Sequence, residues 1–246
     1  MGERLSYLYF DIETVPIFDS REEYLRLRKM IDHKELTRES NRQLYYKMVN
    51  GMLNPHEGKV ISIAYALNDE KLQIVKEWKS SEPAILQEFY NVADTATKEG
   101  WQSKEPLTYV GFGILGFDIP FMFCRMQHHK TATSLQGHDP VWLFRRLFQF
   151  SADLRQMHLH LNDCDSNGLT HDALCSAYGF RTKDMEGKML TDLYYNEKYD
   201  KIEDYIRREF VYPQLLRKIL KDGLVDRKKL KSSVRDVLEK RKTQKS

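Results

Sequence analysis

The sequence of 246 residues predicts an α/β fold. Residues 5–14 have the apolar and aromatic pattern of a buried strand, and residues 59–67 and 72–78 read as two strands joined by a turn at Asn68-Asp69. Amphipathic helical patterns separate these strands from two further ones, near residues 107–112 and 148–154. Strands and helices mixed in this way indicate a sheet covered by helices, in which the first three strands form an antiparallel meander.

Length and composition place the chain in a broad class. The length fits one domain with insertions, and we expect a body at residues 1–220 and a basic C-terminal helix or tail at residues 221–246. No apolar run approaches the roughly 20 residues of a membrane span, and no secretory signal is visible. The three cysteines, Cys124, Cys164 and Cys175, contain no Cys-x-x-Cys and are expected to be reduced. We therefore expect a cytoplasmic protein that has no membrane partner.

Charge is unevenly distributed along the chain. The whole sequence has a formal charge of +3, but residues 221–246 contain ten Lys and Arg against four Asp and Glu. A basic tail on a mildly acidic body can follow the phosphate backbone of a nucleic acid. A solvated terminal helix accounts for the same pattern equally well.

The first strand ends in two acids, Asp11 and Glu13, separated by one residue. Because a strand turns successive side chains to opposite faces, both acids point the same way. Two carboxylates side by side at the end of a buried strand repel each other and lose hydration, unless a proton or a cation offsets the charge. A divalent metal is the usual remedy; the alternative is an edge strand that reaches solvent with both acids hydrated.

The remaining helices follow from apolar periodicity and capping residues. In chain order we expect two inserted helices within residues 20–50, then helices at residues 80–98, 117–126, 141–147, 170–178 and 202–220. Ser81 is expected to cap the helix at 80–98, and Gly100 to end it. Residues 128–139 read as a polar loop.

A glycine-rich turn precedes the helix at 117–126. Residues 111–116 match Gly-x-Gly-x-x-Gly, but we reject a dinucleotide-binding fingerprint, because no second parallel strand ending in an acid is expected next. Asp118 is the more informative residue, since it places an acid at the edge of a buried element. A helix-capping aspartate before a proline in the first turn is the alternative explanation.

Two later groups of side chains need an explanation. His158 and His160 could face one side of a strand with Cys164 nearby, but a metal site is not expected there without a closely spaced second half. Glu209 lies on the apolar stripe of the helix at 202–220, where a buried acid needs a partner. That partner could be a lysine, or the metal that the acid pair of the first strand requires.

Together these acids resemble the three motifs of the DEDD 3′-5′ exonuclease superfamily. Phe-Asp-Ile-Glu-Thr, which contains Asp11 and Glu13, resembles the first motif. Residues 110–122, with Asp118, resemble the second, and Tyr205-Ile-Arg-Arg-Glu209 resembles the third. The chain looks like the proofreading exonuclease domain of family B DNA polymerases as a stand-alone protein. The resemblance implies a ribonuclease-H-like fold with a mixed five-stranded sheet flanked by helices.

The resemblance also implies phosphodiester hydrolysis with two Mg²⁺ or Mn²⁺ ions, roughly 3.5 to 4 Å apart, which bind carboxylate oxygens. Asp11 would bridge the two ions. Glu13 and Glu209 would hold the ion that activates water, and Asp118 would have an outer-shell or second-metal role.

The subclass of exonuclease that the resemblance implies is indicated by a tyrosine. Tyr205 would orient the attacking water, and its ordinary pKa near 10 makes it a poor base at neutral pH. The sister subclass instead puts a histidine near the last acid, and no histidine follows His171. The slot for the terminal nucleotides would be lined by Thr14, Phe112, Leu115 and Phe117. Aromatic stacking there would tolerate any base, and ordinary core packing is the alternative.

Two positions depart from the family pattern. Glu209 stands where the family usually has Asp, and its extra methylene moves the carboxylate by about 1.5 Å. Gly113 stands where related sequences commonly carry Asn, which removes a polar contact to substrate.

We therefore expect a metal-dependent exonuclease that removes nucleotides from the 3′ end of single-stranded DNA or of frayed DNA, in repair or replication. An RNA-trimming exonuclease of the same superfamily is one alternative. A catalytically silent nucleic-acid-binding module, which the two departures favour, is another.

Overall fold

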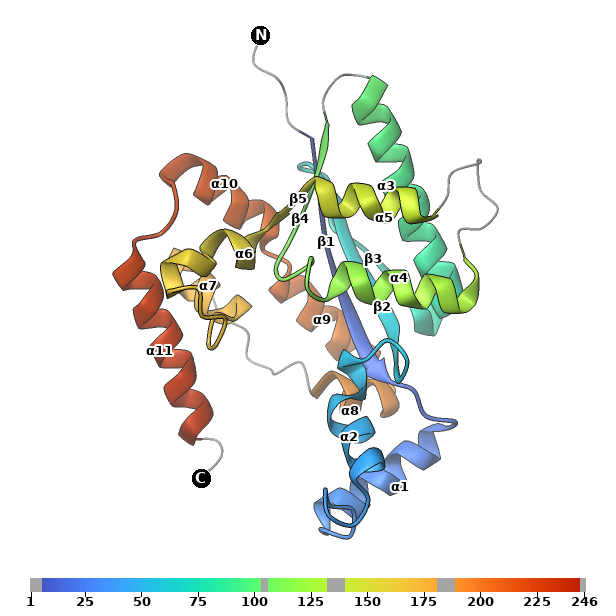
Figure 1. Cartoon of the computed structure of the whole chain (residues 1–246). Helices are drawn as coiled ribbons and strands as arrows, with labels where there is room; N and C mark the ends of the chain where they lie inside the picture. The colour runs from blue at the N-terminus through green and yellow to red at the C-terminus, as the bar shows by residue number, and fades with distance from the viewer. Residues whose placement is uncertain (1–5, 103–105, 132–139, 181–188, 244–246) are drawn as a thin grey trace.

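The computed structural model describes residues 6–102, 106–131, 140–180 and 189–243, and its centre is a twisted sheet (Figure 1). The described strands are β1 (Ser6–Pro16), β2 (Gly58–Leu67), β3 (Gln73–Lys76), β4 (Leu107–Gly111) and β5 (Ser151–Asp153). They form a five-stranded sheet in the order β3-β2-β1-β4-β5. β1 pairs antiparallel with β2, and β2 with β3, whereas β4 runs parallel to β1 and β5 parallel to β4. The antiparallel meander and the mixed five-stranded sheet are therefore confirmed.

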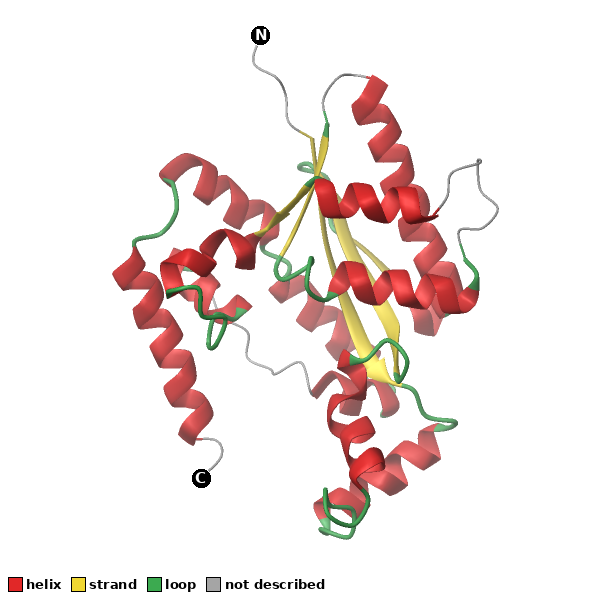
Figure 2. Ribbon diagram, viewed as in Figure 1, coloured by secondary structure: helices red, strands yellow, loops and turns green. Residues whose placement is uncertain are grey.

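Helices surround this sheet (Figure 2). They are α1 (Arg21–Asp32), α2 (Arg42–Asn50), α3 (Glu82–Gln102), α4 (Asp118–His129), α5 (Pro140–Gln149), α6 (Leu154–Leu159), α7 (His171–Tyr178), α8 (Met189–Tyr195), α9 (Tyr199–Glu209), α10 (Tyr212–Asp222) and α11 (Arg227–Thr243). Short 3₁₀ turns η1 (Gly51–Leu53), η2 (Glu77–Lys79) and η3 (His160–Asn162) lie between them. None of the described helices combines the length and the apolar composition that a bilayer crossing requires.

The alternating side chains of β1 divide the interior into two apolar cores. Leu8, Phe10 and Ile12 pack with α3, α4 and α5 on one face of the sheet. Tyr9 belongs to the core on the other face, which α7, α9, α10 and α11 cover. Since side chains on a strand alternate, Asp11 points to the same face as Tyr9, toward α9 and α10.

The two helices expected within residues 20–50 are α1 and α2, which extend from one end of the sheet (Figure 1). Ser20 caps α1 by accepting a hydrogen bond from the amide of Glu23. Tyr24 of α1 stacks on Tyr195 of α8, with ring centroids 4.4 Å apart. This aromatic contact joins the inserted helices to the layer that also contains α9.

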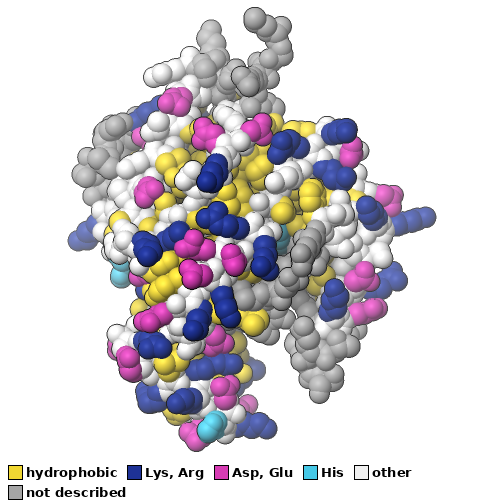
Figure 3. All heavy atoms as spheres, turned by 180° about the vertical axis from the view of Figure 1, so that it is seen from behind, with side chains coloured by type: hydrophobic (Ala, Val, Ile, Leu, Met, Phe, Trp, Pro, Cys, Tyr) yellow, Lys and Arg dark blue, Asp and Glu magenta, His cyan; other side chains and the backbone are white. Residues whose placement is uncertain are grey.

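The basic C-terminal segment forms α11, which packs against α7 through Leu230 and Val234. Two of its bases, Arg227 and Lys231, pair with Asp163. On the face of the molecule shown in Figure 3, acidic and basic side chains are interspersed. The division of the chain at residue 220 stays a prediction.

The helix expected at residues 202–220 is instead two helices, so that prediction is wrong. α9 ends at Glu209, and α10 begins at Tyr212 with Pro213 in its first turn. Proline is compatible with a first turn but would break the hydrogen-bond ladder of a helix interior. The break leaves Glu209 at the C-terminal end of α9, beside the start of α10.

Other expected boundaries also shift. β3 is shorter than predicted because the chain turns into η2, and α3 continues past Gly100 to Gln102. α4 extends to His129, into the expected loop, of which residues 132–139 lie outside the described part of the chain. His158 and His160 lie in α6 and η3 rather than on a strand. His158 is fully buried, with its ring nitrogens 2.7 Å from the Leu154 carbonyl and from the Tyr178 hydroxyl, so its role is structural.

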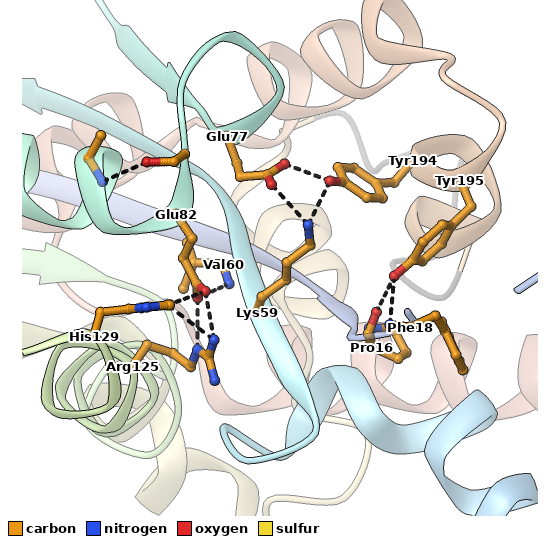
Figure 4. Close-up of polar contacts among 12 residues, drawn as sticks. Pro16, Phe18, Lys59, Val60, Glu77, Glu82, Arg125, His129, Tyr194 and Tyr195 are labelled. Atoms are coloured by element: carbon orange, nitrogen blue, oxygen red, sulfur yellow. Dashed lines mark hydrogen bonds and ion pairs between the residues drawn. The ribbon is translucent and has the colours of Figure 1, made fainter. Parts of the chain in front are cut away.

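Two polar clusters tie the sheet to its surroundings (Figure 4). In the first, Glu82 of α3 accepts hydrogen bonds from Arg125 at 2.8 and 2.7 Å and from the Val60 amide at 2.8 Å. In the second, Lys59 of β2 donates to Glu77 at 2.9 Å and to the Tyr194 hydroxyl at 2.8 Å. The first cluster joins β2 to α3 and α4 on one side of the sheet, and the second joins β2 to α8 on the other side.

Candidate active site

A cavity of about 370 Å³ lies where the end of β1 meets the start of α4, α7 and the junction between α9 and α10. Its lining consists of Asp11, Ile12, Glu13, Phe112, Gly113, Phe117, Asp118, Arg155, Leu169, Thr170, His171, Tyr205, Glu209 and Tyr212. All five residues predicted to be catalytic are in this set. They come from three segments that are far apart in the sequence, so the fold brings the predicted acids together.

The first two acids lie on β1 on either side of a buried residue. Ile12 is 5% exposed and packs into the opposite core, while Asp11 and Glu13 face the cavity. The pairing of β1 with β2 shifts register between Glu13 and Thr14. Such a bulge bends a strand locally and re-aims its side chains. β1 therefore presents its acid pair just before it bends.

The third acid, Asp118, begins α4 and is 3% exposed. The Ile12 amide donates a hydrogen bond to Asp118 Oδ1 at 3.1 Å, which links α4 to β1 between the first two acids. Burial, and next the charge of Asp11, raise the pKa of Asp118 well above its ordinary value. The carboxylate form of Asp118 is therefore costly unless a cation shares the cavity.

We expect Asp118→Asn to stabilise the protein in metal-free buffer. The amide keeps an acceptor for the Ile12 amide but removes the charge that burial and Asp11 disfavour. Because the pKa is raised on folding, the folded state binds an extra proton. The wild-type free energy of unfolding should therefore fall as pH rises from the ordinary pKa of 3.8 through the raised value. Chemical denaturation of both proteins between pH 4 and 8 measures their free energies of unfolding. A difference between the two free energies that does not widen as pH rises would contradict the expectation.

The third segment is the junction of α9 and α10. Tyr205 and Glu209 lie one turn apart on α9, and both line the cavity. Burial and the charges of Glu13 and Glu209 raise the pKa of Tyr205 far above 10. Its phenol therefore keeps its proton at neutral pH and acts as a hydrogen-bond donor rather than a base.

Tyr212 and His171 are among the residues of this site that were not predicted from the sequence. Tyr212 begins α10, is 2% exposed, and donates a hydrogen bond to Asp11 Oδ1 at 3.0 Å. His171 begins α7, and its Nδ1 lies 3.5 Å from Glu209 Oε1. No histidine follows His171 in the sequence, but His171 itself, which precedes the last acid by 38 positions, reaches that acid from another helix.

The His171 ring is held between two aromatic rings. Its centroid lies 5.6 Å from that of Phe112 and 5.4 Å from that of Tyr212, and both contacts are edge-to-face. Phe112 and Phe117, two of the four residues expected at the substrate slot, line the cavity. The other two do not: Thr14 donates a hydrogen bond to the Met52 carbonyl at 2.7 Å, and Leu115 packs against the core under α4.

The glycine-rich turn before α4 is occupied by a carboxylate of the chain itself. Asp153, at the end of β5, accepts hydrogen bonds from the amides of Gly113 at 2.9 Å and Leu115 at 3.0 Å. β5 is a parallel strand that ends in an acid, so the absence of such a strand was a wrong reason for rejecting the dinucleotide fingerprint. The rejection itself stands, because the amides that would hold a pyrophosphate are already used. Gly113 has φ +74°, where glycine and asparagine are favoured.

The donor set of the cavity fits a hard divalent cation. Its four carboxylates supply the oxygen ligands that Mg²⁺ and Mn²⁺ prefer, and the raised pKa of Asp118 is the mark of charge that a cation would offset. Across the described residues, no group of three or more acidic, histidine or cysteine side chains is arranged to hold an ion. Asp11 and Asp118 instead accept hydrogen bonds from Tyr212 and from the Ile12 amide.

Tyr212→Phe should increase the affinity of this site for Mn²⁺. The substitution keeps the buried ring but removes the hydroxyl donor that competes for Asp11 Oδ1. A hydrogen bond to a charged group contributes about 1.5–3 kcal/mol, so a tenfold or larger gain in affinity is expected. Calorimetric titration of both proteins with Mn²⁺ measures it, and Tyr178→Phe, which removes a hydroxyl outside the cavity, is the control. Equal affinities in all three proteins would contradict the expectation.

A mixed sheet whose central strand carries paired acids, with a third acid at the start of the helix after β4 and a fourth on a late helix, has the arrangement of a ribonuclease-H-like fold. Residues 51–246 match the family described as predicted 3′-5′ exonucleases related to the exonuclease domain of PolB, and the chain belongs to that family. The matched region contains Asp118, Tyr205 and Glu209, whereas Asp11 and Glu13 precede it.

A solved structure supports the fold. The family B DNA polymerase of the hyperthermophilic archaeon Pyrobaculum calidifontis is similar, with a TM-score of 0.53 and 16% sequence identity over 88% of this chain. The similar region is 25% of the polymerase chain, so this protein spans about a quarter of its length. No curated protein sequence matches the chain.

Proposed function

We propose that this protein is a metal-dependent 3′-5′ exonuclease that removes nucleotides from the 3′ end of single-stranded DNA or of frayed DNA. The observation that carries the proposal is the convergence of four carboxylates from β1, α4 and α9 on one cavity. Asp118 and Glu209 are buried, and Asp11 and Glu13 are partly buried. Gathering this negative charge destabilises a fold, so the arrangement is explained best by a use for that charge.

The proposed chemistry is hydrolysis of the terminal phosphodiester. Asp11, Glu13, Asp118 and Glu209 would hold two Mg²⁺ or Mn²⁺ ions. When bound, such ions lower the pKa of water and neutralise charge on the attacking and leaving oxygens. Tyr205, protonated at neutral pH, would orient the attacking water by hydrogen bonding. His171, held next to Glu209, would fix the rotamer of that carboxylate.

The substrate is proposed from the lining and from the relatives. Phe112 and Phe117 offer aromatic surface on which a terminal base can stack without sequence preference. DNA is proposed over RNA because the similar structure is a DNA polymerase, and a role in repair or replication follows from that substrate. The three cysteines form no disulfide among the described residues, which fits a reducing compartment, and a cytoplasmic location is part of the proposal.

Matched DNA and RNA oligonucleotides, labelled at the 5′ end, test the proposal. With Mg²⁺ or Mn²⁺ a ladder shortened from the 3′ end is expected on single-stranded DNA, and EDTA should abolish it. Faster shortening of the RNA would indicate the RNA-trimming alternative. A double-stranded DNA with blunt ends is the control for fraying, and equal rates on both DNAs would contradict the preference for single strands.

A catalytically silent nucleic-acid-binding module is a second candidate. It is favoured by the protein donors that already engage the acids, Tyr212 on Asp11 and His171 beside Glu209, and by glutamate in place of aspartate at position 209. A protein that binds the oligonucleotide with either metal but never shortens it would establish this candidate. Glu209→Asp would then be the informative variant, because gained cleavage would assign the silence to the longer side chain.

A further inference from the structure

One cavity residue has the opposite charge from the four acids. Of the described residues that line the cavity, Arg155 alone is a lysine or arginine. It follows β5 in the first turn of α6, where its amide donates to Asp153 Oδ1 at 2.9 Å. The same carboxylate holds the Gly113 amide, so Arg155 and the glycine-rich turn are fixed to one another.

The guanidinium of Arg155 is only partly satisfied by protein groups. One hydrogen bond is made, from Nη2 to the Ser166 carbonyl at 3.2 Å, and no ion pair joins it to a described carboxylate. Arg155 Nε is buried and has no partner among the described residues. A buried donor left unsatisfied costs about 1–3 kcal/mol, which an incoming acceptor would recover.

Glycine at position 113 leaves room for this arginine. A side-chain Cβ at Gly113 would meet Arg155 Cδ at 3.8 Å, so the stem of the arginine runs beside the glycine. The Gly113 position and Arg155 both belong to the cavity lining. The aliphatic part of the Arg155 side chain is therefore packed beside Gly113, while its guanidinium retains N–H donors that can bind a ligand.

The charges of the cavity indicate which kind of ligand Arg155 would bind. A nucleic-acid strand carries a negative charge at each phosphate. Two bound divalent cations would only offset the charge of the four carboxylates, so a further positive charge in the lining favours a phosphate. A planar guanidinium offers paired N–H donors that match the oxygens of a phosphate.

We propose that Arg155 binds a phosphate of the substrate strand at the edge of the acidic cavity. This inference rests on the proposed exonuclease function and adds to it a residue that positions the strand. The guanidinium donates to non-bridging phosphate oxygens, one of which is the acceptor that Nε lacks, and so holds the strand at the edge of the cavity.

Binding of a labelled strand tests the proposal. The probe is a 12-nucleotide oligothymidylate with 5′-fluorescein and phosphorothioate linkages at its 3′ end, measured by anisotropy with Mg²⁺ at several salt concentrations. Arg155→Met should lower the affinity about tenfold and reduce the slope of log K against log salt by about 0.7, the value for one phosphate contact on a single strand. Arg155→Lys should keep the slope while losing part of the affinity. Arg145→Met is the control, since Arg145 is exposed on α5, which covers the other face of the sheet.

The outcomes separate this inference from the proposed function. If the unmodified protein binds and shortens DNA, but Arg155→Met matches Arg145→Met in affinity and slope, Arg155 is not a phosphate ligand and the exonuclease stands. If the unmodified protein neither binds nor shortens the strand, both fail. Thermal unfolding of each variant detects a structural effect. If Arg155→Met does not fold, Arg155→Gln replaces it. A slope of log K against log salt that is smaller for Arg155→Gln than for Arg155→Lys then supports the phosphate contact, and equal slopes contradict it.

Discussion

Asp11→Asn should lower the exonuclease rate by at least about 10²–10³-fold while leaving the fold intact or more stable. Removing one preorganised charged group at a reacting centre has effects of that size. The amide retains an oxygen acceptor for the Tyr212 hydroxyl, and it removes the charge that raises the pKa of Asp118. Single-turnover cleavage with Mn²⁺, together with thermal unfolding in EDTA, measures both effects.

An exposed acid provides the matched control for this variant. Asp69 has a side chain 82% exposed and pairs with Arg217 at 3.5 Å, away from the cavity lining. Asp69→Asn should change neither the rate nor the unfolding temperature appreciably. A large drop in the unfolding temperature of Asp11→Asn would show instead that Asp11 is a structural acid whose charge the fold requires.

Glu82→Gln should destabilise the protein by about 3–5 kcal/mol, which is the cost of removing one partner from a buried ion pair. The side chains of Glu82 and Arg125 are 6% and 4% exposed, and the substitution leaves the Arg125 guanidinium as an uncompensated buried charge. Burial alone would raise the pKa of Glu82, but hydrogen bonds from Arg125, His129 and the Val60 amide lower it. Urea unfolding of both proteins at pH 7 measures the difference.

The pH dependence of the same pair gives a second readout. Because the pKa of Glu82 is lowered on folding, its contribution is present above the ordinary value of 4.5 and is lost as pH falls through the folded value. The difference in free energy of unfolding between wild type and Glu82→Gln should therefore narrow below about pH 4.5. Asp32→Asn, which breaks an exposed pair with Arg28 on α1, should cost less than about 1 kcal/mol. Similar losses in the two variants would contradict the importance of burial.

Much of the fold could be predicted from local pattern. The apolar run of β1 with alternating acids, the turn at Asn68-Asp69 and the capped helices each carry their signal within a few residues. The break between α9 and α10 was missed because apolar periodicity continues across it, from Tyr205 through Tyr212 to Leu216. Pro213 was the local signal for that boundary.

The candidate site was predicted in part, and the missing part has a physical cause. The acids were recognised because buried carboxylates are costly and their spacing resembles a family pattern. Tyr212 and His171 have no such mark, since a tyrosine on an apolar stripe and a histidine after a cap are common in cores. Their roles depend on tertiary packing of α7 and α10 on β1, across a separation of 201 residues in the case of Tyr212 and Asp11.

The long separation between Asp11 and Tyr212 has a consequence during synthesis. A nascent chain on the ribosome displays its N-terminal acids early, whereas α9 and α10, which complete the cavity, are made much later. The proposed nuclease activity should therefore arise only after α9 and α10 have emerged and docked. Until then the nascent chain would lack a complete site for the proposed activity.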